Sequence, residues 1–219
     1  MTLRAVIFDF DGTILDTESS EFLSWHETYT ALGATLDRRL WVQTIGTLDA
    51  AWDPWSQLEE QLGFAVTDRE AILAARVARH HALIEAETVR PGVESWLDQA
   101  DDLGLGIGLA SSSGHDWVTG HLERLGLASR FHAVATGDRV PRTKPDPAVY
   151  LLALRELGVD ASEAVAVEDS VHGVTAAKAA GLTVVAVPNP MTADADFAAA
   201  DHVFASLSAT PIEDIARML

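Results

Sequence analysis

The sequence contains no cysteine, which excludes disulfide bonds, thiolate zinc sites and a thiol nucleophile. It also has no hydrophobic run long enough to cross a membrane, so we expect no membrane partner. The first residues do not form a signal-peptide pattern. Together with the absence of cysteine, this predicts a cytoplasmic protein.

Basic side chains are scarce. Lys and Arg total 15 against 33 Asp and Glu, a formal net charge of −18 at pH 7, and lysine occurs only as Lys144 and Lys178. Nucleic-acid binding depends on cationic residues that neutralise phosphates, so we expect no nucleic-acid partner. The negative field also repels small anions. A phosphate-bearing substrate would therefore need local cationic groups and a metal ion.

What the sequence does contain is a core-forming share of hydrophobic residues, 48% of 219, enough for one large or two modest domains. The apolar run 5–8 predicts a buried strand, and it ends at Asp9 and Asp11, followed by Gly12. A turn alone would explain Asp11 and Gly12. It would not explain Asp9, because a carboxylate at the end of a buried strand costs free energy unless it is paired or binds a metal.

The next seventy residues carry only helical patterns. Apolar residues recur at helical spacing over 17–32, 54–62 and before Ile84, and Thr67 with Glu70 forms a capping-box pattern. A usual crossover between strands is far shorter. We therefore predict an inserted helical domain over 16–89, between core segments 1–15 and 90–219.

From residue 90 onward, strands and helices alternate. The predicted strands are 105–110, 131–135, 164–167 and 183–187, and helices such as 148–157 and 174–180 follow them. This order is typical of helices packed around a parallel sheet. The predicted fold class is α/β, with a Rossmann-like parallel-sheet core and an inserted α-helical domain.

Polar side chains follow several of these strands. Ser111, Lys144 and the pair Glu168 and Asp169 each come after a strand, and parallel strands bring them to the edge of the sheet that carries Asp9. Each has a simpler explanation, as a helix cap or a solvated loop residue. As a set they provide the acids, hydroxyl and cation that phosphate chemistry requires.

These segments resemble the four motifs of the haloacid dehalogenase superfamily, in order and at suitable separations. The motifs are residues 9–13, Ser111, Lys144 with Pro145, and residues 168–170. The helical insertion is similar to that of the subgroup with an α-helical cap domain, which includes β-phosphoglucomutase and small-molecule phosphatases. The resemblance covers essentially the whole chain and implies phosphoryl-transfer chemistry.

The resemblance implies roles for individual residues. Asp9 would attack phosphorus and form an aspartyl-phosphate, while Asp11 would protonate the leaving alcohol and then activate water. Ser111 and Lys144 would hold the phosphoryl oxygens, and Thr13 would orient Asp11.

Mg²⁺ is the implied cofactor. Asp9, Asp169 and the main-chain carbonyl of Asp11 would bind it, with Glu168 acting through a water, because this cation prefers oxygen ligands and retains water.

The implied activity is hydrolysis of a small phosphomonoester, such as a sugar phosphate, by a monomer or weak dimer. Dehalogenases of the superfamily lack an acid at the position of Asp11. The mutases have an arginine and a lysine where this chain has Asp49 and Gly114, and a histidine at the position of Glu21. A β-phosphoglucomutase-like isomerase is the alternative, and a binding protein on an inactive scaffold is a third hypothesis.

Candidates for contacts with the substrate are Ser112, Thr13, Glu18, Glu21 and the loop 44–49. Four tryptophans of the helical segment are expected in its core, with stacking of one of them on a sugar or base as the alternative; they are Trp25, Trp41, Trp52 and Trp55. Three histidines, His80, His81 and His115, are expected on the surface or at helix ends.

Overall fold

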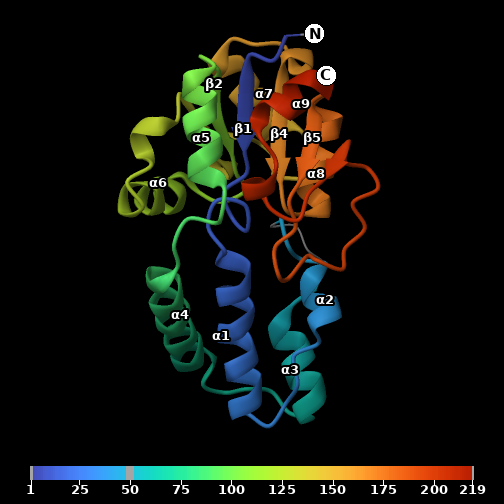
Figure 1. The fold of residues 1–219 in the computed structure, drawn as a ribbon. Helices are drawn as coiled ribbons and strands as arrows, with labels where there is room; N and C mark the ends of the chain where they lie inside the picture. The colour runs from blue at the N-terminus through green and yellow to red at the C-terminus, as the bar shows by residue number, and fades with distance from the viewer. Residues whose placement is uncertain (1, 48–51, 219) are drawn as a thin grey trace.

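The computed structural model describes residues 2–47 and 52–218. Its strands are β1 (Ala5–Phe8), β2 (Gly106–Ala110), β3 (Ala133–Ala135), β4 (Ala164–Glu168), β5 (Thr183–Ala186) and β6 (His202–Val203). Its α-helices are α1 (Thr17–Ala31), α2 (Arg38–Val42), α3 (Pro54–Leu62), α4 (Arg69–Ala86), α5 (Val93–Asp102), α6 (His115–Arg124), α7 (Ala148–Leu157), α8 (Val171–Ala179) and α9 (Ile212–Met218). The predicted α/β fold class is confirmed (Figure 1).

The core is a parallel sheet with strand order β3-β2-β1-β4-β5-β6. β1 lies in its middle and pairs with β2 and β4, so that Ile7 stands opposite Gly108 on one side and Ala166 on the other. Because all strands run the same way, the loops after β1, β2 and β4 leave the sheet at one edge. The helices α1 to α4 lie beyond that edge (Figure 1).

Alternate residues of the strands face opposite sides of the sheet, and helices cover both sides. Val6, Phe8 and Leu109 belong to the cluster that includes residues of α5, α6 and α9. Ala5 and Ile7 belong to the other cluster, with residues of α7 and α8. The central strands β1 and β4 are therefore buried on both faces, and polar groups at their ends are held by a rigid support.

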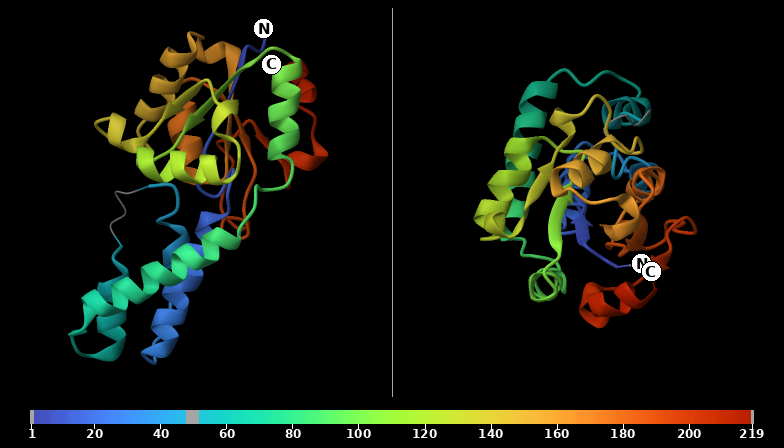
Figure 2. Two further views of the ribbon diagram at one scale, coloured as in Figure 1. Left: turned by 90° about the vertical axis from the view of Figure 1, so that its left-hand side faces the viewer. Right: turned by 90° about the horizontal axis from the view of Figure 1, so that it is seen from above.

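Helices α1 to α4 form a separate layer that we call the helical cap. α1 and α4 pack side by side and extend away from the core (Figure 2). The cap has its own apolar cluster, which includes Trp25, Tyr29, Trp41 and Leu58. The tryptophans were predicted in this core, and Trp52 and Trp55 pack against it while partly exposed.

Local signals placed most helix ends correctly. α3 begins after Asp53, whose carboxylate accepts hydrogen bonds from the backbone of Trp55 and Ser56, and it ends at Gly63 in the left-handed region. The capping box at Thr67 was wrong, because Asp68 is the N-cap of α4 and no side chain caps it.

Two further differences concern the core. α8 begins at Val171, three residues earlier than predicted, because the Ser170 hydroxyl accepts a hydrogen bond from the backbone of Gly173. β6 was not predicted, since two residues are too few for an alternation pattern.

One loop of the core reaches into the cap. Met191, which follows β5, is buried in the apolar cluster of the cap. Arg38 of α2 donates hydrogen bonds to the carbonyls of Pro190 and Met191.

No helix in the described part of the chain combines the length and the hydrophobicity of a membrane span.

Candidate active site

Asp9 and Asp11 follow the central strand β1. The backbone N–H of Asp9 still bonds to Val167 of β4, at 2.9 Å, so this residue remains tied to the sheet. Gly12 has φ +82°, and a Cβ atom there would lie 2.1 Å from Oδ2 of Asp169. Glycine is therefore required twice, by the backbone conformation and by the close approach of the two loops.

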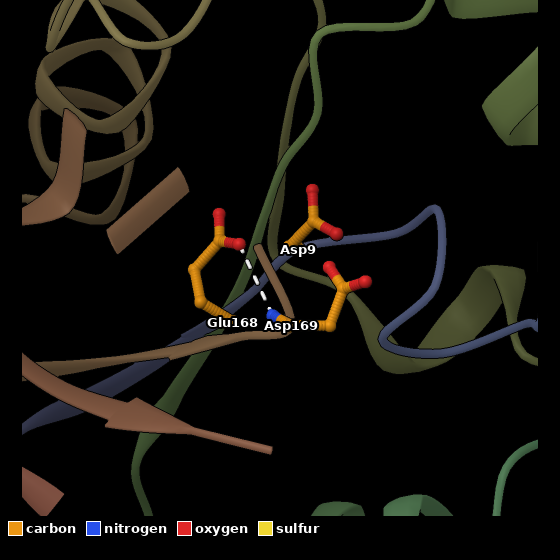
Figure 3. A group of neighbouring side chains, drawn as sticks. All are labelled: Asp9, Glu168 and Asp169. Carbon is orange, nitrogen blue, oxygen red and sulfur yellow. Dashed lines mark hydrogen bonds between the residues drawn. The ribbon is translucent and has the colours of Figure 1, made fainter. Parts of the chain in front are cut away.

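Three buried carboxylates meet at the edge of the sheet. Oxygens of Asp9, Glu168 and Asp169 lie within 4.8 Å of one another (Figure 3). The ammonium of Lys144 is also buried; it forms an ion pair with Asp9 and a 2.7 Å ion pair with Glu168. Lys144 thus pairs with two of the three carboxylates, and the cluster can accommodate further positive charge.

The surroundings shift the pKa values of these groups. Burial raises the pKa of Asp9 to about 7, although Lys144 opposes the shift. Burial and the neighbouring charges of Asp9 and Glu168 raise the pKa of Asp169 well above its usual value. Burial alone would lower the pKa of Lys144, but the carboxylates of Asp9 and Glu168 raise it. Lys144 is therefore held as a cation.

The donor set fits Mg²⁺, because it consists of carboxylate oxygens with no nitrogen or sulfur ligand. Within it, Glu168 is already engaged. Its Oε1 accepts from Lys144 and from the Tyr150 hydroxyl at 2.6 Å. Its Oε2 accepts from the hydroxyl of Ser170 and, at 3.2 Å, from the backbone N–H of Asp169, the bond drawn in Figure 3. Each oxygen of Glu168 thus accepts at least two hydrogen bonds, whereas each oxygen of Asp169 accepts one, which favours Asp9 and Asp169 as the direct ligands.

Asp169 is oriented by two neighbours. Its Oδ1 accepts from the hydroxyl of Thr13 at 3.3 Å, and its Oδ2 accepts from the amide of Asn189 at 2.5 Å. Thr13 was expected to orient Asp11 and was also a candidate for substrate contact. Instead its hydroxyl bonds Asp169, it is almost fully buried, and it does not line the cavity described below.

Asp11 has hydrogen-bond partners that differ from those of the carboxylate cluster. Its Oδ2 accepts from the hydroxyl of Ser113 at 2.6 Å and from that of Ser111 at 3.2 Å. Its Oδ1 accepts from the indole N–H of Trp117 at 2.9 Å. All three donors belong to the loop after β2 and to α6, so one segment of the core sets the orientation of this carboxylate.

A cavity of about 320 Å³ lies between the core and the cap. The core contributes Asp9, Asp11, Ser111, Ser112, Ser113 and Trp117, and the cap contributes Thr17, Glu18, Glu21, Trp41, Thr44, Gly46, Thr47 and His80. This places Asp9 and Asp11 at one wall and the predicted substrate contacts Ser112, Glu18 and Glu21 around the same space. Lys144, Glu168 and Asp169 lie behind Asp9 in the buried cluster.

The cap wall is polar and partly unpaired. Glu21 accepts from Arg76 at 2.8 Å and contacts Nδ1 of His80 at 2.8 Å. Burial raises the pKa of Glu21, but the hydrogen bond and charge of His80 and the charge of Arg76 outweigh burial. The net result is a pKa below the usual value. Nε2 of His80 and Nε1 of Trp41 are buried without a hydrogen-bond partner among the described residues. Both side chains line the cavity, so a polar ligand there could pair them.

The surface placement of His80 was therefore wrong, whereas His81 and His115 are exposed as expected. His80 is only 9% exposed because it packs between Glu21 and the ring of Trp117. The neighbouring Glu18 also lines the cavity, and burial together with the charge of Asp11 raises its pKa well above the usual value.

Sequence reasoning missed Ser113, Trp117, Tyr150 and Asn189. Asn189 comes two residues after a predicted strand, so the rule that located Ser111 could have located it. No comparable signal marks Trp117 or Tyr150, whose roles come from packing between helices and the sheet. Asp49, which entered the comparison with mutases, lies outside the described residues.

Residues 3–181 match the family model of the haloacid dehalogenase-like hydrolases. The chain belongs to this family. It is 45% identical to YhcW of Bacillus subtilis (strain 168) over 94% of this chain and 93% of that one. YhcW is named as a "putative phosphatase". It is 33% identical to hexitol phosphatase B of Escherichia coli (strain K12), over 97% and 96%. The resemblance noted in the motifs is thereby confirmed.

A solved structure gives the same result for the fold of this haloacid dehalogenase-like hydrolase. A mutant of CbbY from Rhodobacter sphaeroides, in complex with xylulose-(1,5)bisphosphate, superposes with a TM-score of 0.71 at 30% identity, covering 94% of this chain and 95% of that one. The chain is thus similar along nearly its whole length to a protein crystallised with a small phosphorylated sugar.

Proposed function

We propose that this hydrolase is a Mg²⁺-dependent phosphatase that cleaves small phosphomonoesters of the sugar or polyol type through an aspartyl-phosphate on Asp9. The observation that carries the proposal is the position of two aspartates at one cavity wall. Asp9 is backed by Lys144 and Asp169, while Asp11, two residues later, faces the same space with different partners. A nucleophile and an acid with separate surroundings suit a double displacement.

The first step would break the bond between phosphorus and the leaving alcohol. An oxygen of Asp9 attacks phosphorus, and Asp11 gives its proton to the departing oxygen. Lys144 and Ser111 hold the phosphoryl oxygens as charge spreads over them. In the second step Asp11 takes a proton from water, the water oxygen attacks phosphorus, and Asp9 is released with inorganic phosphate.

Asp9 and Asp169, with the main-chain carbonyl of Asp11, would hold the Mg²⁺, and Glu168 would fix Lys144 and contact the ion only through water. When bound, the ion neutralises phosphoryl charge and so lowers the cost of bringing an anionic substrate to a carboxylate. The excess of buried carboxylates over cations in the cluster supports this assignment.

The cap wall supports a leaving group that is neutral and rich in hydroxyls. Glu18 and Glu21 offer acceptors, His80 offers an unpaired nitrogen, and Trp41 offers an apolar face with an N–H. Neither Lys nor Arg lines the cavity among the described residues, so a second phosphate would find no strong partner there. The relative named as a hexitol phosphatase agrees with this chemistry.

The same absence weakens the mutase alternative, in which a bisphosphate must be retained. The nearby Arg76 is engaged by Glu21 and Ser24. We therefore propose hydrolysis. The proposal includes a monomer or weak dimer in the cytoplasm. Residues 16–89 act as a cap that closes on 1–15 and 90–219 and excludes water.

A panel of phosphorylated metabolites, assayed for phosphate release with Mg²⁺ and with EDTA, tests the proposal. We expect metal-dependent release from a hexitol or hexose monophosphate by the wild type, and loss of release in Asp9→Asn. Isomerisation of a hexose phosphate with little phosphate release would establish the mutase instead. Equal turnover by Asp9→Asn would refute both.

A further inference from the structure

We propose that Trp117 is a positioning residue, whose indole N–H aims Asp11 at the leaving group. This inference rests on the proposed phosphatase function. The indole Nε1 lies 2.9 Å from Oδ1 of Asp11, while the hydroxyl of Ser113 lies 2.6 Å from Oδ2. One donor on each oxygen fixes both the position and the plane of a carboxylate, which a single hydrogen bond does not do.

The third donor, Ser111, cannot serve this purpose throughout the reaction. Its contact with Asp11 is longer, 3.2 Å, and its hydroxyl also accepts from the backbone of Ser113 at 2.9 Å. In the proposed reaction this hydroxyl turns to the phosphoryl group. Trp117 and Ser113 then remain as the two groups that hold Asp11.

Trp117 is itself held from two sides. On its own helix, the ring of His121 meets it edge-on at 4.4 Å between centroids. From the cap, His80 of α4 stacks on it at 5.9 Å with an interplanar angle of 21°. The indole therefore fills the junction between α6 of the core and α4 of the cap, and its orientation depends on the cap being in place.

The contact continues into the part of the cavity that would receive the leaving group. His80 is bonded through Nδ1 to Glu21, which lines the cavity. A leaving group bound at Glu21 and His80 thus rests on the same ring stack that orients Asp11. In this arrangement, binding of the leaving group and alignment of its proton donor occur together.

The proposal predicts a loss that depends on the leaving group. An alkoxide needs a proton as its bond to phosphorus breaks, whereas p-nitrophenolate leaves without one near neutral pH. The ratio kcat/KM reports the steps up to departure of this group and excludes the later hydrolysis of the aspartyl-phosphate. A purely structural residue would lower this ratio equally for both substrates.

The experiment compares Trp117→Phe with the wild type on sorbitol 6-phosphate and on p-nitrophenyl phosphate. We expect kcat/KM to fall about 100-fold for sorbitol 6-phosphate and by less than about threefold for p-nitrophenyl phosphate. Trp55→Phe is the matched control, because Trp55 is a cap tryptophan that does not line the cavity, and both ratios should stay within about twofold of the wild type.

A second pair of variants removes the dependence on how well Trp117→Phe folds. Ser113→Ala, which lacks the other donor, should show the same selective loss on sorbitol 6-phosphate, and Ser113→Thr, which keeps the hydroxyl, should restore most of it. A double-mutant cycle of Trp117→Phe with His80→Ala should be non-additive for sorbitol 6-phosphate, since the two rings act through one contact.

The outcomes separate the two proposals. If the wild type releases phosphate from neither compound, the proposed function fails. If the wild type is active but Trp117→Phe and Ser113→Ala lower both ratios equally, or leave both unchanged, the positioning role is refuted and the phosphatase stands.

Discussion

The two walls of the cavity differ in how their polar groups are satisfied. On the core side, Lys144 and Glu168 are almost completely buried, and the ammonium of Lys144 forms ion pairs with both Glu168 and Asp9. On the cap side, His80 and Trp41 each leave a buried nitrogen without a partner among the residues that the structure describes. The polar groups of the core side therefore bond one another and leave only an excess of carboxylate charge, whereas the cap side retains two buried nitrogens that a polar ligand could pair.

The largest effect should come from removing the buried cation on the core side of the cavity. Lys144→Met leaves the buried carboxylates of Asp9 and Glu168 without their cation, so we expect about 3 kcal/mol lower free energy of unfolding and about a 10³-fold lower kcat. Urea unfolding and steady-state kinetics measure both quantities.

The chain provides one matched control for this change, its second lysine. Lys178 forms an exposed ion pair with Asp201, and Lys178→Met should cost less than about 1 kcal/mol and leave kcat unchanged. Equal losses of stability and kcat in the two variants would show that the buried ion pairs of Lys144 contribute no more than the exposed ion pair of Lys178.

Adding Mg²⁺ tests the excess of carboxylates in the core wall. At a concentration about 100-fold above its Kd, the ion should stabilise the folded protein by about 2.7 kcal/mol and raise Tm. Asp169→Asn should abolish the increase, because it removes a direct ligand of the proposed site. A wild-type Tm that is insensitive to Mg²⁺ would contradict the assignment independently of any activity.

A smaller effect is expected at Gly173, where the backbone lies against the buried carboxylate of Glu168. A Cβ atom at Gly173 would lie 2.0 Å from the carboxylate of Glu168, which Lys144 and Tyr150 hold in place. Gly173→Ala should therefore lower the free energy of unfolding by about 2 kcal/mol and reduce kcat. Gly120→Ala is the control: no atom lies within 4 Å of its Cβ position in α6, and we expect a gain of about 0.5 kcal/mol. Two similar values would mean that Glu168 can move freely.

The smallest effect should arise on the cap wall. Glu21→Gln weakens the contacts with Arg76 and His80, so we expect a loss of about 1 kcal/mol at pH 7 and a higher KM for sorbitol 6-phosphate. Because the folded pKa of Glu21 lies below the unfolded value of about 4.3, its contribution is present above that pH and is lost as the pH falls through the folded pKa.

Unfolding measured from pH 7 downward checks this prediction, and the difference between Glu21→Gln and the wild type should shrink once the pH falls below the unfolded pKa. Glu27→Gln on the same helix is the control, because its ion pair with Arg79 is exposed and should contribute about 0.5 kcal/mol or less. A difference for Glu21→Gln that does not change with pH would point to packing in place of charge.

The core could be predicted from the sequence because its signals are local and repeated. Short β-branched strands predicted the sheet, and the rule for parallel strands brought Ser111 to Asp9's edge although about a hundred residues separate them. The hydrogen-bond partners of the site residues and the burial of His80 could not be predicted. Thr13 bonds Asp169 and not Asp11, and His80 is buried, because each depends on how two segments distant in sequence pack together.

The cap shows the same limit more clearly. Helical spacing predicted its helices, and Asp53 and Gly63 marked the ends of α3. The same spacing says nothing about which side of α4 faces α6, and this choice decides that His80 meets Trp117. Tertiary packing between the core and the cap therefore determines the cap side of the cavity, while local patterns determine the helices and strands themselves.

The loop after β5 acts as a tether between the two units. Asn189 fixes Asp169 at 2.5 Å, and two residues later Met191 is embedded in the apolar cluster of the cap. Any swing of the cap away from the core must either extract this methionine or pull the asparagine with it. Opening of the lid and disturbance of a proposed metal ligand are thus mechanically linked through three consecutive residues.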